Sequence, residues 1–212
     1  MREKIIQSFI DNKLVAIVRG ITEDKIVPLA EALSAGGIKM IEVTFNQADP
    51  SSFISTANSI RALAANGVMA GAGTVVTLQQ LEMAAEAGAQ YIIAPNTNPE
   101  IISATRKKEL VSIPGALTAS ECMIAHDAGA DFIKLFPINK LGSDYLKALS
   151  SPLNHLKFLV VGGVNENNMK EFLAVGAAGF GVGGNLVSKE LVNAGEFEKI
   201  TALAKKYVDA LV

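Results

Sequence analysis

Residues 127–136 read Asp127-Ala128-Gly129-Ala130-Asp131-Phe132-Ile133-Lys134-Leu135-Phe136 and hold the repeating unit of this chain. A helical pattern ends at a glycine, and a short apolar run follows it. A glycine just past a helix accepts the left-handed backbone that ends the helix. A short apolar run between such signals is typical of a strand that is buried on both faces in a parallel sheet. The stretch therefore indicates a helix followed at once by a buried parallel strand.

The same unit recurs along the chain. Three more helical patterns end at a glycine, at Ala35-Gly36-Gly37, Glu86-Ala87-Gly88-Ala89 and Ala174-Val175-Gly176-Ala177. The apolar runs that we predict to be strands are Leu14–Val18, Met40–Thr44, Val68–Ala72, Tyr91–Ala94, Val111–Ile113, Asp131–Phe136, Phe158–Val161 and Gly179–Val182. The stretches that we predict to be helices are Arg2–Asn12, Thr22–Ala35, Pro50–Ala65, Thr77–Ala87, Pro99–Lys108, Ala119–Ala128, Ser143–Leu149, Glu166–Val175 and Glu196–Leu211.

Eight strands, each followed by a helix, predict an α/β fold of the (β/α)8 or TIM barrel type, with Arg2–Asn12 as an extra N-terminal helix. About 250 residues are typical of that fold, so we expect a compact version in which residues 1–212 form a single domain. An open doubly wound sheet is the alternative. That fold usually carries a G-x-G-x-x-G turn after its first strand, and Arg19-Gly20 does not continue into one. We therefore favour the barrel.

Composition narrows the classes of function. The formal net charge of −2 argues against a broad basic surface, so we expect no nucleic-acid partner. No apolar run approaches the roughly 20 residues that span a bilayer, so we expect no membrane partner. Cys122 is the only cysteine, which excludes a disulfide within the chain and fits a cytoplasmic location. The only histidines, His126 and His155, form no metal-binding motif, so we expect no metal.

Lys134 is out of place in its apolar run. Under the period-two alternation of a strand, Phe132, Lys134 and Phe136 share one face, which we expect to point into the barrel. Burial would lower the pKa of the amine from about 10.4 toward neutrality, and a neutral amine forms a Schiff base with a ketone. The alternative is a lysine whose stem packs while its ammonium extends to water. The first hypothesis is therefore an imine-forming enzyme.

Glu42 is the second polar residue within an apolar strand. It shares a face with Met40 and Thr44. A buried carboxylate is nearly always paired, so one interpretation is a structural ion pair with Lys134 or Arg19. The other is a proton-transfer group whose pKa is raised by its environment. Because Glu42 and Lys134 are both polar residues in apolar strands, one shared catalytic site is a better explanation than two unrelated occurrences.

Two further polar side chains follow strands. Arg19 ends the first strand at its C-terminal edge, where barrel active sites lie, and its guanidinium suits a substrate carboxylate. Thr74 follows Gly71-Ala72-Gly73, whose small residues would let the backbone approach a ligand. An exposed arginine and a tight turn are the structural alternatives.

Paired glycines follow the last two strands. Gly162 and Gly163 end the seventh strand, and Gly183 and Gly184 end the eighth. Barrels often bind phosphate with the loops after these two strands, through backbone N–H groups that glycine leaves accessible. Turn geometry alone is the alternative interpretation of these glycines.

With these residues assembled, the chain resembles the class I aldolases that cleave 2-keto-3-deoxy-6-phosphogluconate (KDPG) and 4-hydroxy-2-oxoglutarate (KHG). The resemblance runs nearly end to end. It is carried by Val15-Ala16-Ile17-Val18-Arg19, Ile41-Glu42-Val43-Thr44, Gly71-Ala72-Gly73-Thr74-Val75, Ala94-Pro95-Asn96, Ile113-Pro114-Gly115, Phe132-Ile133-Lys134-Leu135-Phe136-Pro137 and Gly162-Gly163-Val164.

The resemblance implies a barrel lyase that acts on small-molecule substrates such as pyruvate and a 2-keto-3-deoxy sugar acid. It implies a homotrimer that needs neither a metal nor a cofactor. It makes Lys134 the Schiff-base residue and Glu42 the proton shuttle. Arg19 and Thr74 would contact the pyruvyl carboxylate, and Pro95 and Phe136 would form walls of the pocket.

The chain departs from the family pattern at three positions. Some members carry an arginine at the position of Asn46. In this chain Arg19 would take the role of that arginine. Position 161 is often threonine and here is Val161, and the last loop often reads Gly-Ser where this chain has Gly184-Asn185. We count Asn185 with the phosphate-binding residues. Because the changes at Val161 and Asn185 touch the phosphate site, a substrate without phosphate is the alternative.

Several functions therefore remain open. The favoured substrate is the phosphogluconate-type acid, which would yield pyruvate and glyceraldehyde 3-phosphate. The nearest alternatives are 4-hydroxy-2-oxoglutarate and the galactonate epimer, whose aldolases the run Arg19-Gly20-Ile21-Thr22 also resembles. A phosphate-binding barrel isomerase without an imine, or a catalytically silent sugar-phosphate binder, would leave Lys134 and Glu42 unexplained.

Overall fold

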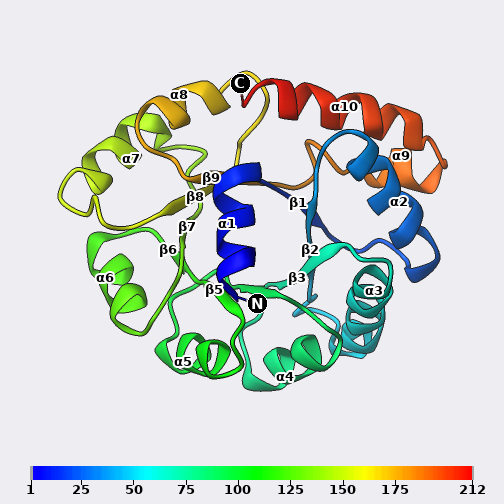
Figure 1. The fold of residues 1–212 in the computed structure, drawn as a ribbon, viewed down its shortest axis with the longest axis horizontal. Coiled ribbons are helices and arrows are strands. Elements are labelled where there is room, and N and C mark those ends of the chain that lie inside the picture. Colours follow the sequence, from blue (N-terminus) through cyan, green and yellow to red (C-terminus); the bar gives the residue numbers. More distant parts are fainter. Residues whose placement is uncertain (1, 212) are drawn as a thin grey trace.

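The computed structural model describes residues 2–211, whose parallel strands form a ring inside a circle of helices (Figure 1). The strands are β1 (Leu14–Val18), β2 (Met40–Thr44), β3 (Met69–Gly73), β4 (Tyr91–Ile93), β5 (Val111–Ile113), β6 (Gly115–Ala116), β7 (Ile133–Leu135), β8 (Phe158–Val161) and β9 (Gly179–Val182). The helices are α1 (Arg2–Asn12), α2 (Glu23–Ala35), α3 (Phe53–Ala65), α4 (Leu78–Glu86), α5 (Pro99–Lys107), α6 (Ala119–Asp127), α7 (Gly142–Ser150), α8 (Met169–Ala174), α9 (Lys189–Asn193) and α10 (Phe197–Asp209), with a 3-10 turn at Pro50–Ser52.

The ring closes through residues 111–116. β5 pairs with β4 on one side, and β6 pairs with β7 on the other. Pro114 separates β5 from β6 because it has no N–H to donate to a neighbouring strand. The Lys134 N–H still donates to the Pro114 carbonyl at 2.8 Å, so the break does not open the barrel. The predicted (β/α)8 barrel is confirmed, with its fifth strand divided in two.

Side chains alternate between two apolar layers. Ile41 and Ile133 point outward and pack against the helices. Met40 and Phe132, their neighbours in sequence, belong to a smaller cluster inside the ring. The predicted inward face of the strand that carries Lys134 is therefore the observed one.

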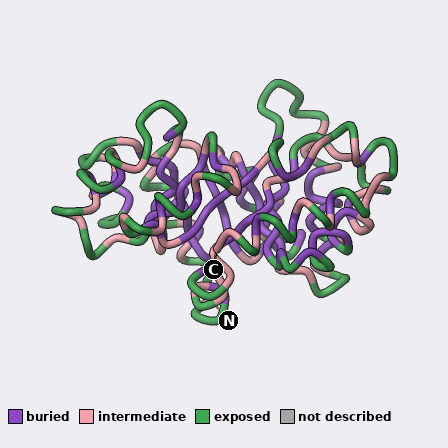
Figure 2. Tube along the Cα trace, turned by 90° about the horizontal axis from the view of Figure 1, so that it is seen from above, coloured by how far each residue is buried: buried purple, intermediate pink, exposed green. Residues whose placement is uncertain are grey.

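Helix α1 covers the N-terminal end of the barrel. The ring of Phe9 lies 5.0 Å from that of Tyr91 and 5.2 Å from that of Phe132, centroid to centroid. Arg2 forms an ion pair with Asp131, which precedes β7. In Figure 1, α1 crosses the middle of the ring, and Figure 2 shows the N-terminal segment projecting on one side of it. The predicted extra helix thus serves as the floor of the barrel.

Two short helices near the C-terminus differ from the expectation. α8 begins at Met169 rather than at Glu166, because side chains in the preceding loop bind backbone N–H groups. Asn168 Oδ1 accepts from the N–H of Asn165 at 2.9 Å, and such local bonds compete with helix formation. α9 lies outside the predicted helices, and Ser188 caps it by accepting a hydrogen bond from the N–H of Leu191 at 3.3 Å.

Within residues 2–211, no helix has the length and apolar character that crossing a membrane would require. The same residues contain no group of three or more His, Cys, Asp or Glu side chains placed to hold a metal ion.

Candidate active site

Lys134 is the middle residue of β7, and its side chain stays buried, with 7% of its surface exposed. The amine Nζ lies 5.0 Å from the centroid of the Phe136 ring, as the predicted shared face requires. The alternative of a lysine that reaches out to water is therefore wrong. This amine is held in an apolar environment.

Glu42 is the middle residue of β2 and is 1% exposed. Its side chain leans across the neighbouring strand β3. A Cβ built on Gly73 would lie 1.8 Å from Oε1 of Glu42, which only a glycine avoids. Gly73 therefore provides the space that the Glu42 carboxyl occupies.

Gly71 makes similar room for Tyr91. A Cβ at position 71 would lie 2.1 Å from the Tyr91 ring. Glu42 pairs with Gly71, and Gly71 pairs with Tyr91, so the three residues lie at one level of the barrel. The space beside these glycines, which we expected to admit a ligand, is filled by the chain's own side chains.

The environment favours the neutral forms of both reactive groups. Burial lowers the pKa of the Lys134 amine; the Glu42 carboxyl opposes this shift, and Arg19 adds to it. Burial raises the pKa of Glu42, while Lys134 and Arg19 lower it. Within residues 2–211, Glu42 makes no ion pair with either cation, so the structural ion-pair interpretation finds no support. A neutral amine can attack a ketone, and a carboxyl with a raised pKa can supply the proton that departing water needs.

Arg19 lies at the C-terminal end of β1 and is exposed. Its charge is felt by both Glu42 and Lys134, so it stands over the same end of the barrel as they do. Arg19 also lines a cavity at this end of the barrel, and it is solvent-accessible as the structural alternative proposed.

Thr74 follows β3 with a φ of 57°, a conformation that is unusual for a β-branched residue. Its carbonyl accepts a hydrogen bond from Nε2 of Gln47 at 2.8 Å. Gln47 in turn accepts from Nε2 of the buried Gln80 at 2.9 Å, and Gln80 Oε1 accepts from the N–H of Val76 at 2.8 Å. These bonds hold the loop in its strained form, and such strain is often found at functional sites.

Pro95 and Phe136 follow β4 and β7, and both are half-buried. The carbonyl of Pro95 packs against Gly115, where a Cβ would lie 2.4 Å from its oxygen. The Lys134 amine lies over the Phe136 ring, and Phe136 also lines a cavity. The ring therefore links the buried amine to the open part of the site.

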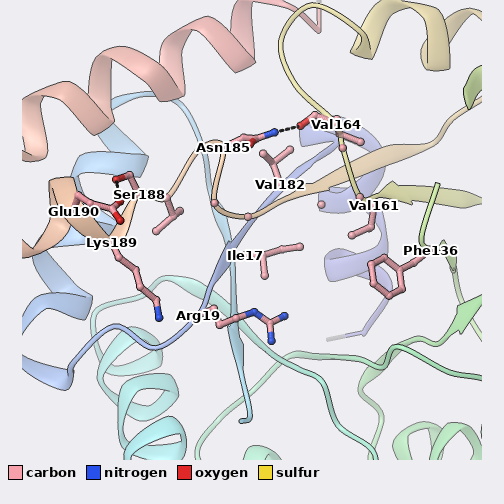
Figure 3. A pocket seen from close by; sticks show the side chains of 16 residues that line it. Ile17, Arg19, Phe136, Val161, Val164, Val182, Asn185, Ser188, Lys189 and Glu190 are labelled. Atoms are coloured by element: carbon pink, nitrogen blue, oxygen red, sulfur yellow. Dashed lines mark hydrogen bonds between the residues drawn. The ribbon is translucent and has the colours of Figure 1, made fainter. Parts of the chain in front are cut away.

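A cavity of about 490 Å3 opens at this end of the barrel (Figure 3). Its walls come from β1, the two loops after β8 and β9, and the start of α9. All five residues predicted to bind phosphate line it: Gly162, Gly163, Gly183, Gly184 and Asn185. Lys134 and Glu42 are buried and are not among the lining residues.

The backbone conformation requires glycine at one of the two glycine pairs and not at the other. Gly162 and Gly163 have φ values of 102° and 71°, so turn geometry alone requires glycine there. Gly183 and Gly184 have ordinary φ values. A Cβ at Gly184 would meet nothing within 4 Å, and one at Gly183 would make only normal contacts. The fold does not require these two glycines, so their role in binding a ligand stays a prediction.

Asn185 and Val161 occupy the two positions that depart from the family pattern. Nδ2 of Asn185 donates to the carbonyl of Val164 at 3.2 Å and so ties the two loops together (Figure 3). Val161 is buried beside the same cavity. Neither side chain presents a hydroxyl to a ligand.

Two residues of the site escape the sequence analysis. Tyr91 is assigned there only to a strand, although its alternation with the outward-pointing Ile92 places it inside the barrel. Lys189 lines the cavity from the first position of α9, in a stretch too short to show helical periodicity. The sequence signal that could have identified Lys189 is its positive charge, a few residues after Gly183 and Gly184.

Known proteins resemble this chain over most of its length. The probable 2-dehydro-3-deoxy-6-phosphogalactonate aldolase of Rhizobium meliloti (strain 1021) is 35% identical over 83% of this chain and 82% of its own. The 2-dehydro-3-deoxy-phosphogluconate aldolase of Treponema pallidum (strain Nichols) is 36% identical over 85% of this chain and 84% of its own.

A solved structure is similar both in sequence and in fold. The KDPG aldolase from Legionella pneumophila, with pyruvate captured at low pH as a covalent carbinolamine intermediate, is 30% identical. It aligns with a TM-score of 0.82 over 94% of this chain and 96% of its own.

The model of an aldolase family described as KDPG and KHG aldolase matches residues 5–203. The barrel, the buried lysine and the buried carboxyl agree with that match. The chain belongs to the KDPG and KHG aldolase family and is an aldolase, a carbon–carbon lyase.

Proposed function

We propose that this aldolase cleaves a 2-keto-3-deoxy-6-phospho sugar acid of the phosphogluconate type through a Schiff base on Lys134. The products would be pyruvate and glyceraldehyde 3-phosphate. One observation carries the proposal: the Lys134 amine and the Glu42 carboxyl are buried in the same barrel, and burial favours the neutral form of each. The carbinolamine captured in the Legionella relative supports the same chemistry.

The first half of the reaction forms the imine. The neutral Lys134 amine attacks the C2 ketone of the substrate and gives a carbinolamine. Glu42 protonates the departing hydroxyl, water leaves, and a positively charged iminium remains on Lys134. The Glu42 carboxyl is thereby left ionised, which the new positive charge stabilises.

The second half breaks the carbon–carbon bond. The ionised Glu42 removes the proton of the C4 hydroxyl, the C3–C4 electron pair moves toward the iminium, and the aldehyde fragment leaves. The enamine that remains takes a proton at C3, and water hydrolyses the iminium to pyruvate and free Lys134. One carboxyl acts in turn as acid and base, which requires a pKa near the working pH.

The other predicted residues complete this scheme. We assign Arg19 and Thr74 to the pyruvyl carboxylate, because both lie at the C-terminal edge near the reactive pair. Pro95 and Phe136 form the walls around the pyruvyl group. The loops of Gly162, Gly163, Gly183, Gly184 and Asn185 hold the phosphate, and binding energy from that remote group helps at the reacting carbon.

A second candidate substrate is the galactonate epimer. The 35% identity to the relative from Rhizobium meliloti favours it, since that protein is named for the galactonate acid. The unphosphorylated 4-hydroxy-2-oxoglutarate is a third, favoured by the lack of hydroxyls at Val161 and Asn185. All three share the Schiff-base chemistry.

We also propose a homotrimer located in the cytoplasm. The family resemblance supports this assembly. Light scattering coupled to size-exclusion chromatography tests it, and a monomer at micromolar concentration would reject it.

Borohydride reduction in the presence of pyruvate tests the imine. We expect mass spectrometry to find one reduced pyruvyl adduct on Lys134, and none in Lys134→Met. The matched control is Lys157→Met, because Lys157 also lies near an aromatic ring, 5.8 Å from the centroid of Phe132, but is exposed. Absence of an adduct on Lys134 in the unmodified chain would reject the scheme.

A substrate panel tests the specificity. Both phosphorylated epimers, their unphosphorylated acids and 4-hydroxy-2-oxoglutarate should be assayed for pyruvate release. We expect the highest kcat/KM with the phosphogluconate-type acid. A preference for an unphosphorylated acid would contradict the proposed substrate but leave the imine chemistry intact.

A further inference from the structure

We propose that Lys189 recognises the charge of a phosphate ester at the distal end of the substrate and so determines the specificity of this aldolase. The inference rests on the proposed function, which assigns phosphate to the loops after β8 and β9 but gives that phosphate no cation. It names the residue that distinguishes a phosphorylated acid from its unphosphorylated counterpart.

Few of the residues that line the cavity after β8 and β9 are charged. Of the residues that line the cavity, Arg19 and Lys189 are cationic and Glu190 is anionic. Arg19 is electrostatically coupled to Glu42 and Lys134 and therefore serves the reactive end. Lys189 enters from the loop after β9, beside the glycines assigned to phosphate. Lys189 lines the cavity together with those glycines.

Lys189 is an exposed residue, and its ammonium lies beside the loop after β1. A Cβ built on Gly20 would lie 2.8 Å from its Nζ, so the ammonium rests on the loop after β1. Figure 3 shows the side chain extending from the start of α9 toward the side of the cavity where Arg19 lies. The missing side chain at Gly20 leaves that path clear.

Lys189 is free to bind an anion. Within residues 2–211 it forms no ion pair, whereas Lys108 and Lys199 pair with Glu82 and Glu196. Its neighbour Glu190 is engaged elsewhere, because Oε2 of Glu190 accepts a hydrogen bond from the hydroxyl of Ser188 at 2.6 Å. The adjacent carboxylate therefore does not neutralise the ammonium by direct contact.

The rest of the phosphate site is neutral, which explains why a cation is needed. The glycine loops offer backbone N–H groups, and Nδ2 of Asn185 already donates to the Val164 carbonyl. Neutral donors orient a phosphate, but a charged donor forms a shorter and stronger bond to it. Lysine often binds phosphate in this way, as a point charge at the end of a flexible stem.

Substitution at position 189 tests the inference. Lys189→Gln keeps a long polar side chain and removes the charge. We expect kcat/KM for the 6-phosphorylated acid to fall roughly 10- to 100-fold, as for the loss of a charged hydrogen bond, and kcat/KM for the unphosphorylated acid to stay within about twofold. Lys189→Arg should restore most of the activity toward the phosphorylated acid.

Lys170→Gln is the matched control, since Lys170 is an exposed lysine of α8 that lines none of the described cavities. It should behave as the unmodified chain with both substrates. Raising the salt concentration should weaken the phosphate preference of the unmodified chain more than that of Lys189→Gln. Equal losses with both acids, or no loss with either, would overturn the role of Lys189.

Two measurements separate this inference from the proposed function. Pyruvate trapping by borohydride must remain unchanged in Lys189→Gln, and failure of the unmodified chain to trap pyruvate would reject the aldolase scheme instead. Inorganic phosphate, followed by 31P line broadening, probes the cation without turnover. Weaker phosphate binding by Lys189→Gln supports the inference, and unchanged binding overturns it whatever the substrate.

Discussion

The carboxyl of Glu42 occupies the space that a side chain at Gly73 would take, with 1.8 Å between Oε1 and the position of a Cβ. The two residues are on adjacent strands, and Glu42 pairs in register with Gly71 rather than with Gly73. The carboxyl therefore reaches forward along the barrel, toward the C-terminal edge where Arg19 and Thr74 lie. A glycine two residues past the register partner sets the direction of the Glu42 carboxyl, which we propose as the proton shuttle.

Gly73→Ala should displace the Glu42 carboxyl without removing it. A misplacement of about 1 Å can cost roughly 100-fold in rate, so we expect kcat to fall by about that factor. Lys134 is untouched, so slow trapping of pyruvate on prolonged incubation should persist. Steady-state kinetics and mass spectrometry check both outcomes, and wild-type turnover in Gly73→Ala would show that the direction of Glu42 is unimportant.

Glu42→Gln should change the acidity of the amine. The Glu42 carboxyl raises the pKa of Lys134, so its removal should lower that pKa further. The fraction of neutral amine at a given pH then increases, and the pH midpoint for pyruvate trapping should move to lower pH, although proton transfer is lost. Trapping yields measured at equilibrium across a pH series check this, and a midpoint that moves upward would contradict the coupling.

Lys134→Met should stabilise the fold at neutral pH. The pKa of Lys134 is lowered from 10.5 by burial, so the unfolded chain binds this proton more readily than the folded chain does. The contribution of Lys134 to the stability of the unmodified chain therefore rises with pH between the lowered pKa and 10.5, by up to about 1.4 kcal/mol per pH unit. Met removes this dependence.

Urea unfolding at a series of pH values checks that expectation. The difference in stability between Lys134→Met and the unmodified chain should be largest at the lower pH and shrink as the pH approaches 10.5. A difference that does not vary with pH would mean that the amine is charged in the folded chain.

Tyr91→Phe should not destabilise the barrel. The Tyr91 hydroxyl is buried and has no hydrogen-bond partner within residues 2–211, and an unsatisfied buried donor costs about 1–3 kcal/mol. Phe fills the same space, so we expect a gain of about 1 kcal/mol in the free energy of unfolding. Tyr145→Phe is the control, because the Tyr145 hydroxyl donates to the Leu117 carbonyl and its removal should cost about 1 kcal/mol. Equal losses in both variants would show that Tyr91 has a partner.

Local pattern was sufficient for the strands and for the orientation of Lys134. Five of the eight predicted strands begin and end at the predicted residues. Alternation along β7 placed Phe132 and Lys134 on the inner face, since the period of two is a property of any strand. The break at Pro114 follows from its missing N–H, although the predicted strand ends at Ile113 and does not include the short β6 beyond it.

Contacts that depend on the register between strands could not be predicted from the sequence. Nothing near Gly73 indicates that a carboxyl from another strand will lie over it, because that contact follows from barrel closure. The same is true of Lys189 and Gly20, which come together only when the last loop meets the first. α9 has five residues, too few for a periodic pattern to emerge.

The floor that α1 lays beneath Tyr91 and Phe132 also bears on how products depart. Because α1 covers the N-terminal end of the barrel, products leave through the C-terminal end. In the proposed scheme the pyruvyl fragment is bonded to Lys134 deep in the barrel. The aldehyde fragment lies nearer the opening and must depart before the tethered fragment is set free. Under the proposed Schiff-base scheme, the architecture therefore sets the order of release, and pyruvate leaves last.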